Sequence, residues 1–138
     1  MVISKELQDS IEITVEKLRN KDVVIIPTDT VYGFSGIVPW TEDSIRQIKG
    51  REDNKPFIQL IASPKDIIYY TDEKIDKKYL AMWPGPLTII VPQKEDKTKT
   101  IALRCPNDEW LRKVIELTGF SIYSTSVNYS GKKILSDI

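Results

Sequence analysis

The chain has 138 residues, the length of one ordinary domain, so one hydrophobic core is expected and two are not. Its 20 Lys and Arg residues balance 20 Asp and Glu residues, so no net charge draws it toward nucleic acid or an anionic membrane. It contains no histidine and one cysteine, which excludes Ser-His-Asp and Cys-His catalysis, an intramolecular disulfide and a zinc-thiolate cluster.

The apolar runs of the chain are short. Residues 23–26 form one of the longest, far below the roughly 20 residues that a membrane-spanning helix needs. The N-terminal stretch lacks the basic region and the apolar region of a signal peptide. We therefore expect a globular, cytoplasmic protein with no membrane partner.

The N-terminal part of the chain predicts helices and strands in alternation. Apolar residues at helical spacing predict an amphipathic helix over residues 1–20, with Ser4 as its N-cap. The apolar run within residues 22–26 predicts a strand that is covered on both faces, and residues 31–38 predict a second extended segment. A helix over residues 41–48 follows.

The rest of the chain continues this alternation. Further strands are expected at residues 56–62, 87–91, 101–104 and 120–124. Capping residues predict three more helices, which begin after Ser63, Asp72 and Asn107, and the last of them is expected to stop at Gly119. No repeat or linker divides the chain. The alternation predicts a single α/β domain with a twisted mixed β-sheet and flanking helices, whose strand order cannot be read from the pattern.

A polar segment follows the first expected strand. Residues 27–33 read PTDTVYG and place Thr28, Asp29 and Thr30 at the end of that strand. Ligand-binding residues of α/β sheets gather at strand ends. The alternative is a polar turn in which these side chains satisfy local backbone donors.

Three cations lie close together in the sequence at Lys49, Arg51 and Lys55. Arginine binds phosphate in a bidentate manner and lysine as a point charge, so this group could hold a phosphorylated ligand. The alternative is that a lysine in a last helical turn favours the helix dipole and that Gly50 merely ends the helix.

Three later segments could also carry chemistry. Residues 83–88, WPGPLT, indicate a rigid turn that needs no ligand to explain it. The strand that ends at Arg104 leaves an arginine either on the surface or in a cleft, where it would suit a carboxylate. Residues 124–128, STSVN, bear hydroxyl and amide groups that could converge on a polar ligand, and a local Ser/Thr turn is the alternative.

Taken together and in this order, the segments resemble the YrdC family, the threonylcarbamoyl-AMP synthases that make an intermediate for a modified adenosine in tRNA. The matching stretches are PTDTVYG, KGR followed by KP, WPGPLT, LRCP, and STSVN followed by SG. The resemblance covers residues 23–131. Collinear matches at sensible spacing favour a shared family over five separate coincidences.

The resemblance implies an α/β fold of the YrdC type and a nucleotidyltransferase reaction. L-threonine, bicarbonate or carbon dioxide, and ATP would yield threonylcarbamoyl-AMP and pyrophosphate, with Mg²⁺ accompanying the triphosphate. The adenylate would pass to a separate tRNA-modifying transferase. No histidine is required, because nucleotidyl transfer depends mainly on positioning and charge neutralisation.

The resemblance also assigns roles to residues. Those assigned to ATP are Lys49, Arg51, Lys55, Thr100, Ser126 and Asn128, with Lys49 and Arg51 as the catalytic pair. Those assigned to L-threonine are Thr30, Arg104 and Ser124. Asp29 would help to orient the metal or act as a base, or it would serve only as a cap.

The sequence departs from the family at three places. Family members usually continue well beyond the SG that follows STSVN, so residues 1–138 are expected to form a YrdC-like domain without that C-terminal segment, which leaves the closure of the ATP site in question. Gln59-Leu60 stands where some members have a histidine near threonine. Val127 replaces the commoner alanine.

Two alternatives remain. A non-catalytic RNA-binding or regulatory module would use the same cationic residues and the concave face that the family was thought to offer to tRNA or double-stranded RNA, although the balanced charge argues against it. A carbamoyl-transfer relative of the YrdC-like domain in hydrogenase maturation proteins is the other, and those chains are much longer.

Overall fold

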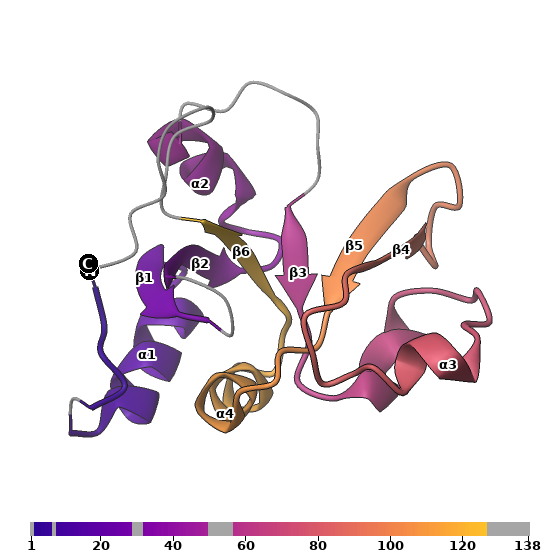
Figure 1. Ribbon diagram of the computed structural model, residues 1–138. Helices are drawn as coiled ribbons and strands as arrows, with labels where there is room; N and C mark the ends of the chain where they lie inside the picture. The colour runs from indigo at the N-terminus through magenta and orange to yellow at the C-terminus, as the bar shows by residue number, and fades with distance from the viewer. Residues whose placement is uncertain (1, 7, 29–31, 50–56, 127–138) are drawn as a thin grey trace.

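Six strands form one mixed sheet with helices on both faces, as the computed structural model shows (Figure 1). The structure describes residues 2–6, 8–28, 32–49 and 57–126. The strands are β1 (Val24–Pro27), β2 (Tyr32–Ile37), β3 (Ile58–Leu60), β4 (Ile89–Pro92), β5 (Thr100–Arg104) and β6 (Ile122–Ser126). The helices are α1 (Ser10–Arg19), α2 (Glu42–Lys49), the 3₁₀ helix η1 (Pro64–Tyr69), α3 (Lys77–Leu80) and α4 (Glu109–Thr118). The expected α/β class is confirmed.

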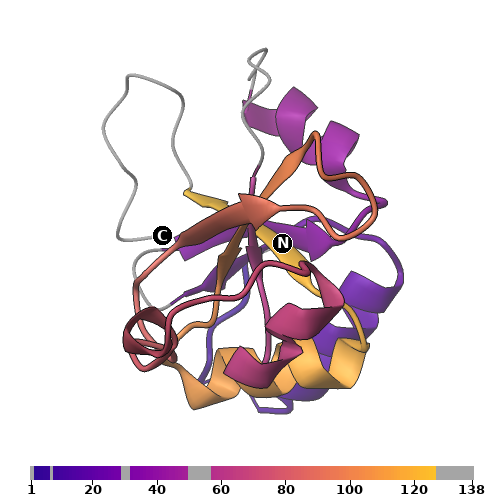
Figure 2. The same ribbon diagram turned by 90° about the vertical axis from the view of Figure 1, so that its right-hand side faces the viewer.

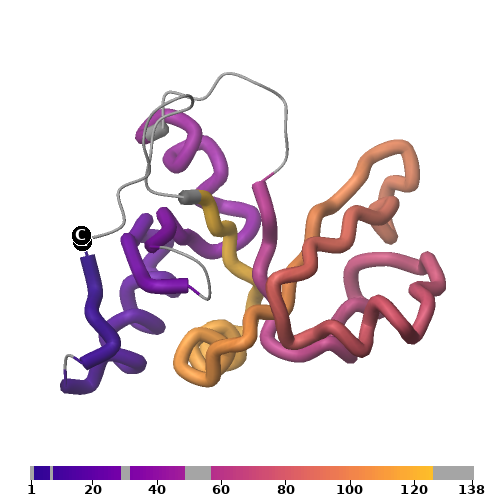
Figure 3. Tube along the Cα trace, in the orientation of Figure 1, coloured from indigo at the N-terminus to yellow at the C-terminus, as the bar shows by residue number. Residues whose placement is uncertain are grey.

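The strand order differs from the chain order. The strands lie in the order β1-β2-β6-β3-β5-β4, so β6 is inserted between β2 and β3 near the centre of the sheet (Figure 3). Only β3 and β5 pair in parallel among these strands, and the other neighbours are antiparallel. This order brings Gly33 and residues 124–126, which are far apart in the sequence, onto the neighbouring strands β2 and β6.

Helices α1 and α4 cover one face of the sheet, side by side (Figures 1 and 2). Leu18 of α1 and Leu111 of α4 are fully buried against the sheet residues Ile26, Leu60 and Ile122. Full burial of each such side chain stabilises the fold by about 1.5 to 3 kcal/mol. We call this face the α1/α4 face.

Helix α2 and the segment that contains η1 and α3 cover the opposite face, which we call the α2 face. Ile45 of α2 packs with Phe57 and Tyr123 in one cluster. Ile67 of η1 packs with Trp83 in another, against β4 and β5. The face assignment follows from the registers, because side chains alternate along a strand and directly paired residues share a face.

The N-terminal segment corrects one expectation. Helix α1 begins at Ser10, and its N-cap is Asp9 rather than Ser4, whose hydroxyl instead donates to Glu6. Ile3 is fully buried, and its amide donates to the carbonyl of Ile25 at 2.9 Å. The residues before the helix therefore run alongside β1. Burial of the apolar Ile3 side chain in the core contributes more free energy of folding than an added residue of exposed helix would.

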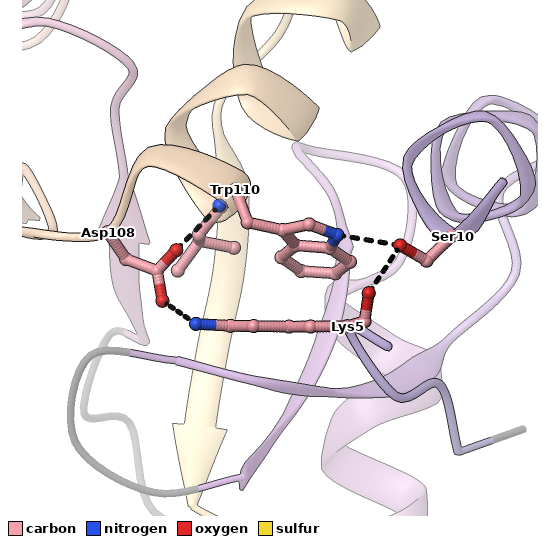
Figure 4. Close-up of polar contacts among 5 residues, drawn as sticks. Lys5, Ser10, Asp108 and Trp110 are labelled. Carbon is pink, nitrogen blue, oxygen red and sulfur yellow. Dashed lines mark hydrogen bonds and ion pairs between the residues drawn. The ribbon is translucent and has the colours of Figure 1, made fainter. Parts of the chain in front are cut away.

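A polar network fastens this N-terminal segment to α4 (Figure 4). The Lys5 ammonium forms an ion pair with Asp108, and the same carboxylate accepts the amide of Leu111 at 3.0 Å. The Trp110 indole donates to Ser10 Oγ at 2.9 Å, and that hydroxyl donates to the Lys5 carbonyl at 3.1 Å. Asp108 thus both caps α4 and holds the segment in place.

Other helix caps lie close to, but not on, the expected residues. Asp76 caps α3 in place of Asp72, and Asp108 caps α4 in place of Asn107. In each case a neighbouring aspartate has the geometry that lets its carboxylate accept an amide of the first turn. Ser63 does precede a helix, but that helix is 3₁₀ and the serine makes no side-chain cap bond. Gly119 ends α4 with φ of 80°, as expected.

Two further expectations need correction. Strand β1 is buried at alternate residues and half-buried between them, so the expected full cover on both faces is wrong. The reason is its place in the sheet: the strand lies at the end of the strand order, where covering elements are fewer. The expected strand at residues 56–62 narrows to β3.

Within the described residues, no helix combines the length and apolarity needed to span a bilayer.

Candidate functional site

Residues from four strands share the α1/α4 face of the sheet. Ser124 of β6 pairs with Ser35 of β2 and with Ile58 of β3. Ile58 pairs in turn with Ala102 of β5, and Arg104 lies on the same face two residues further along. The structure therefore places two of the residues assigned to L-threonine, Ser124 and Arg104, on one face of the sheet.

Arg104 ends β5 and is buried, with 8% of its surface exposed. A guanidinium taken out of water costs free energy unless anionic or carbonyl oxygens surround it. Its place on a face with small and hydroxyl-bearing residues suits a ligand carboxylate, which the fork of an arginine binds with two parallel hydrogen bonds.

The surroundings of Gly33 in the sheet explain why the PTDTVYG segment has a residue without a side chain at this position. It pairs with Ser126 across β2 and β6. A Cβ at Gly33 would lie 3.1 Å from Ser124 Oγ and 3.2 Å from the Thr125 carbonyl, closer than ordinary packing allows. The absence of a side chain at position 33 therefore leaves room for the Ser124 hydroxyl, and Ser124 as a whole is 8% exposed.

Thr100, assigned to ATP, lies at the other end of β5 from Arg104. It is exposed, and four residues of strand place its Cα about 13 Å from that of Arg104 at about 3.3 Å per residue. The N-terminal ends of β5 and β3 and the C-terminal end of β6 lie together at the end of the sheet where Thr100 is found. The backbone of Ser126 ends β6 here.

Several expected site residues lie outside the described residues, so their roles stay predictions. They are Asp29, Thr30, Arg51, Lys55, Val127 and Asn128, together with the Gly50 expected to end α2. Lys49 is the last residue of α2, and its backbone and that of Ser126 are described while their side chains are not.

Gln59 and Leu60, which are consecutive residues of β3, lie on opposite faces of the sheet. Gln59 pairs with Tyr123 and Leu103 on the α2 face, and it accepts a hydrogen bond from Ser121 at 3.1 Å. Leu60 is fully buried on the α1/α4 face. Gln59 is therefore directed away from Ser124, because neighbouring residues of a strand point to opposite faces.

Four residues that the sequence analysis did not single out form a closed ring of contacts on the α2 face. Arg46 lies over the Phe57 ring, 4.5 Å from its centroid, and its Nε donates to Glu42 at 3.3 Å. The Tyr123 hydroxyl donates to the other oxygen of Glu42 at 3.4 Å. The rings of Phe57 and Tyr123 meet edge to face at 5.9 Å. Only the Glu42–Arg46 spacing, one helical turn, could be seen in the sequence.

The environment of Tyr123 keeps its hydroxyl protonated. Burial raises the pKa of Tyr123 far above the usual value, and the negative charge of Glu42 raises that pKa further. Its hydroxyl therefore acts as a donor to the Glu42 carboxylate over the whole physiological pH range.

The α2 face also has a hollow of about 430 Å³. Gln59, Ile101 and Tyr123 contribute to its lining, so it opens on the opposite side of the sheet from Ser124 and Arg104. Its lining carries tyrosine hydroxyls and glutamine amides together with the carboxylates of Glu42 and Glu95 and the ammonium of Lys94, so cations are not grouped there. It is therefore separate from the face on which the threonine-assigned residues lie.

The described residues contain no group of three or more carboxylate, thiol or imidazole side chains that could enclose a metal ion. Mg²⁺ usually keeps several waters and is held by one or two carboxylates together with substrate phosphates. The described residues by themselves therefore form no cage of this kind.

Comparisons with known proteins find similar sequences and similar folds. A family model for Sua5, YciO and YrdC proteins, described as "Telomere recombination", matches residues 16–138. Threonylcarbamoyl-AMP synthase of Bacillus subtilis is 34% identical over 129 residues, which cover 83% of this chain and 37% of that protein. A crystal structure of P. abyssi Sua5 complexed with L-threonine superimposes with a TM-score of 0.84 at 30% identity, covering 97% of this chain and 44% of that one.

A third comparison concerns the fold alone. The crystal structure of E. coli YciO superimposes with a TM-score of 0.75 at 22% identity and covers 96% of this chain and 71% of that one. The chain spans less than half the length of the B. subtilis and P. abyssi proteins.

Proposed function

The chain belongs to the Sua5/YciO/YrdC family, and from this membership together with the geometry of the α1/α4 face we propose that it forms threonylcarbamoyl-AMP from L-threonine, bicarbonate or carbon dioxide, and ATP. The observation that carries the proposal is the placement of Ser124, Arg104 and the side-chain-free Gly33 on one face of the sheet, on strands β6, β5 and β2. Such a reaction belongs in the cytoplasm, where ATP and tRNA are present.

In this proposal Arg104 binds the threonine carboxylate and Ser124 hydrogen-bonds the amino acid beside it. Two parallel bonds to a guanidinium fix both the position and the orientation of a carboxylate. The glycine at position 33 leaves space for the Ser124 hydroxyl that makes this bond, because a Cβ there would lie 3.1 Å from Ser124 Oγ. Thr30 would complete this half of the site.

The nucleotide half of the proposed site lies toward the edge where β6 ends and β5 begins. Lys49 and Arg51 neutralise the phosphates there and act as the catalytic pair. The other residues assigned to ATP are Lys55, Thr100, Ser126 and Asn128. Mg²⁺ accompanies the triphosphate, where it offsets negative charge on the phosphate oxygens.

The proposed chemistry requires positioning more than acid or base groups. The threonine amine first captures carbon dioxide as a carbamate. A carbamate oxygen then attacks the α-phosphorus of ATP, and the bond between that phosphorus and the bridging oxygen to the β-phosphorus breaks as pyrophosphate leaves. Cations aimed at the phosphates stabilise the charge that moves onto the leaving group.

The test is an assay for pyrophosphate. The protein is incubated with Mg-ATP, bicarbonate and L-threonine, and pyrophosphate formation that requires all three is expected. Omission of threonine serves as the control, since ATP hydrolysis by a contaminant would continue without it. No threonine-dependent pyrophosphate at any enzyme concentration would contradict the proposal.

A salt titration of RNA binding separates the synthase from an RNA-binding module of the same fold. RNA affinity that falls steeply with salt, without ATP binding, would favour the module, because phosphate contacts release counterions. Threonine binding that depends on ATP would favour the synthase. The adenylate product would be handed to a separate transferase that acts on tRNA.

A further inference from the structure

We propose that the ring formed by Glu42, Arg46, Phe57 and Tyr123 is a positioning device for nucleotide binding, which sets the end of α2 relative to the end of β6. The inference rests on the proposed function, since it concerns the same ATP site. The ring itself does not contact the substrate in this proposal. The four ring residues act through Lys49, which ends α2, and through β6.

The ring connects three elements that nothing in the sequence places together. Glu42 and Arg46 belong to α2, Phe57 precedes β3, and Tyr123 belongs to β6. Phe57 and Tyr123 are 2% and 4% exposed, whereas the side chains of Arg46 and Glu42 are 20% and 43% exposed, so the aromatic half of the ring is buried and its charged half lies nearer the surface. Each member contacts two others, so no single residue can shift without disturbing two contacts.

The ring lies next to the backbone positions that matter for ATP. Arg46 is one helical turn before Lys49 on α2, and Tyr123 is three residues before Ser126 on β6. Lys49 and Ser126 are both assigned to ATP, so the distance between α2 and β6 determines how they are spaced. A shift of about 1 Å in groups that hold a reacting substrate can reduce the rate by about 100-fold.

The chemistry of the ring suggests more than space filling. An apolar contact between α2 and β6 would stabilise the fold at least as well as a partly buried carboxylate and guanidinium, because charged groups lose hydration on burial. Charged and hydroxyl groups have preferred directions, whereas apolar contacts permit sliding. Arg46 over the Phe57 ring and the Glu42 carboxylate shared by two donors therefore fix a single arrangement.

Arg46→Lys is the main test variant. Lysine keeps the positive charge that pairs with Glu42 but lacks the planar guanidinium that stacks on Phe57. The affinity for Mg-ATP, measured by titration calorimetry with threonine present, is expected to fall by about 10-fold or more. The thermal unfolding temperature, measured in parallel, is expected to change little. Phe57→Leu is the second variant and should give the same loss of ATP affinity.

A double-mutant cycle with Lys49→Ala distinguishes positioning from a general loss of stability. If Arg46 acts through Lys49, adding Arg46→Lys to the Lys49→Ala protein should weaken ATP binding by less than about twofold. If Arg46 affects ATP binding independently of Lys49, the two losses should multiply.

Phe120→Leu is the matched control. Phe120 also meets a second aromatic ring edge to face, that of Trp40 at 5.2 Å, and Lys21 lies over that ring at 4.9 Å. Trp40 and Phe120 are each about half exposed. Trp40 precedes the start of α2 and Phe120 precedes the start of β6, whereas Lys49 is at the end of α2. The control should leave ATP affinity within about twofold of the unsubstituted protein.

The outcomes separate the two proposals. A protein that forms threonine-dependent pyrophosphate but whose ATP affinity is unchanged by Arg46→Lys and by Phe57→Leu would overturn the positioning role alone. Multiplicative losses in the double-mutant cycle would also overturn it. If the unsubstituted protein binds no Mg-ATP, the proposed function and the positioning role both fail.

Discussion

Gly33 and Ser124 lie on neighbouring strands, and the missing side chain of the glycine is what gives the serine hydroxyl its room. The two residues come from opposite ends of the chain and meet only because β6 is inserted beside β2. Ser35, which pairs directly with Ser124, is fully buried, and its hydroxyl is directed toward the Gly33 carbonyl. A Cβ at position 33 would thus meet Ser124 Oγ, the Thr125 carbonyl oxygen and the Thr28 methyl group.

A methyl group at position 33 should weaken threonine binding more than it weakens the fold. In Gly33→Ala the new Cβ would press on Ser124 Oγ, which must shift by a few tenths of an ångström. Threonine affinity, measured by calorimetry, should fall about tenfold, while the free energy of unfolding should fall by no more than about 1 kcal/mol. In the control Gly36→Ala the Cβ would lie 2.7 Å from Thr41 Cβ, so stability should fall by about 1 to 3 kcal/mol. Equal threonine affinity in Gly33→Ala and the unsubstituted protein would remove Gly33 from the site.

Arg104 should be required for threonine binding but not for ATP binding. In Arg104→Gln the charge-assisted bonds to the threonine carboxylate are lost, which corresponds to about 1.5 to 3 kcal/mol of binding free energy. Arg112→Gln is the control, because Arg112 donates to the Ala62 carbonyl at 2.8 Å from α4 and has no assigned ligand. Calorimetry with threonine should show a loss for the first variant only. A loss of similar size in both would indicate a structural effect.

The network that holds the N-terminal segment should contribute measurably to stability. In Trp110→Phe the indole donor to Ser10 disappears, and the partly buried hydroxyl loses one partner, at a cost of about 1 kcal/mol. Asp108→Ala removes the α4 cap together with the Lys5 ion pair, and the cap alone is expected to be worth about 0.5 to 2 kcal/mol. Urea unfolding measures both values. An Asp108→Ala protein as stable as the parent would contradict the network.

The raised pKa of Tyr123 predicts a loss of stability at high pH. Below about pH 10 the tyrosine is protonated in both the folded and the unfolded chain, so its contribution to stability is complete. Above that pH the unfolded chain releases the proton while the folded chain retains it, so stability falls as the pH rises toward the raised folded-state pKa.

Replacement by phenylalanine isolates this effect from the lysines that titrate nearby. In Tyr123→Phe the free energy of unfolding should fall less steeply than in the parent between about pH 9.5 and 11, by up to about 1.4 kcal/mol per pH unit. Urea unfolding at several pH values gives both slopes. Parallel slopes would mean that the Tyr123 pKa is the same in the folded and unfolded chains.

The pattern of apolar and polar residues along the chain was enough to predict much of the local structure. The strand that ends at Arg104, the apolar side of α4 and its stop at Gly119 all follow from periodicity and from the conformational freedom of glycine, and the structure confirms them. The motifs around Gly33 and Ser124 also indicated the family, which the comparisons confirm. Helix caps were predicted within a few residues, because several aspartates and serines lie near each helix start and only their final geometry selects one.

Tertiary structure alone decided which of these segments meet. Strand order depends on how the sheet buries the most apolar area, and that is a property of all six strands together rather than of any one window of sequence. For the same reason the ring that joins Arg46 and Phe57 to Tyr123 could not be predicted, since its members lie on three elements whose packing the local pattern does not specify. The separation of Gln59 from Leu60, one on each face of the sheet, follows from strand register, which becomes defined only when the neighbouring strands pair.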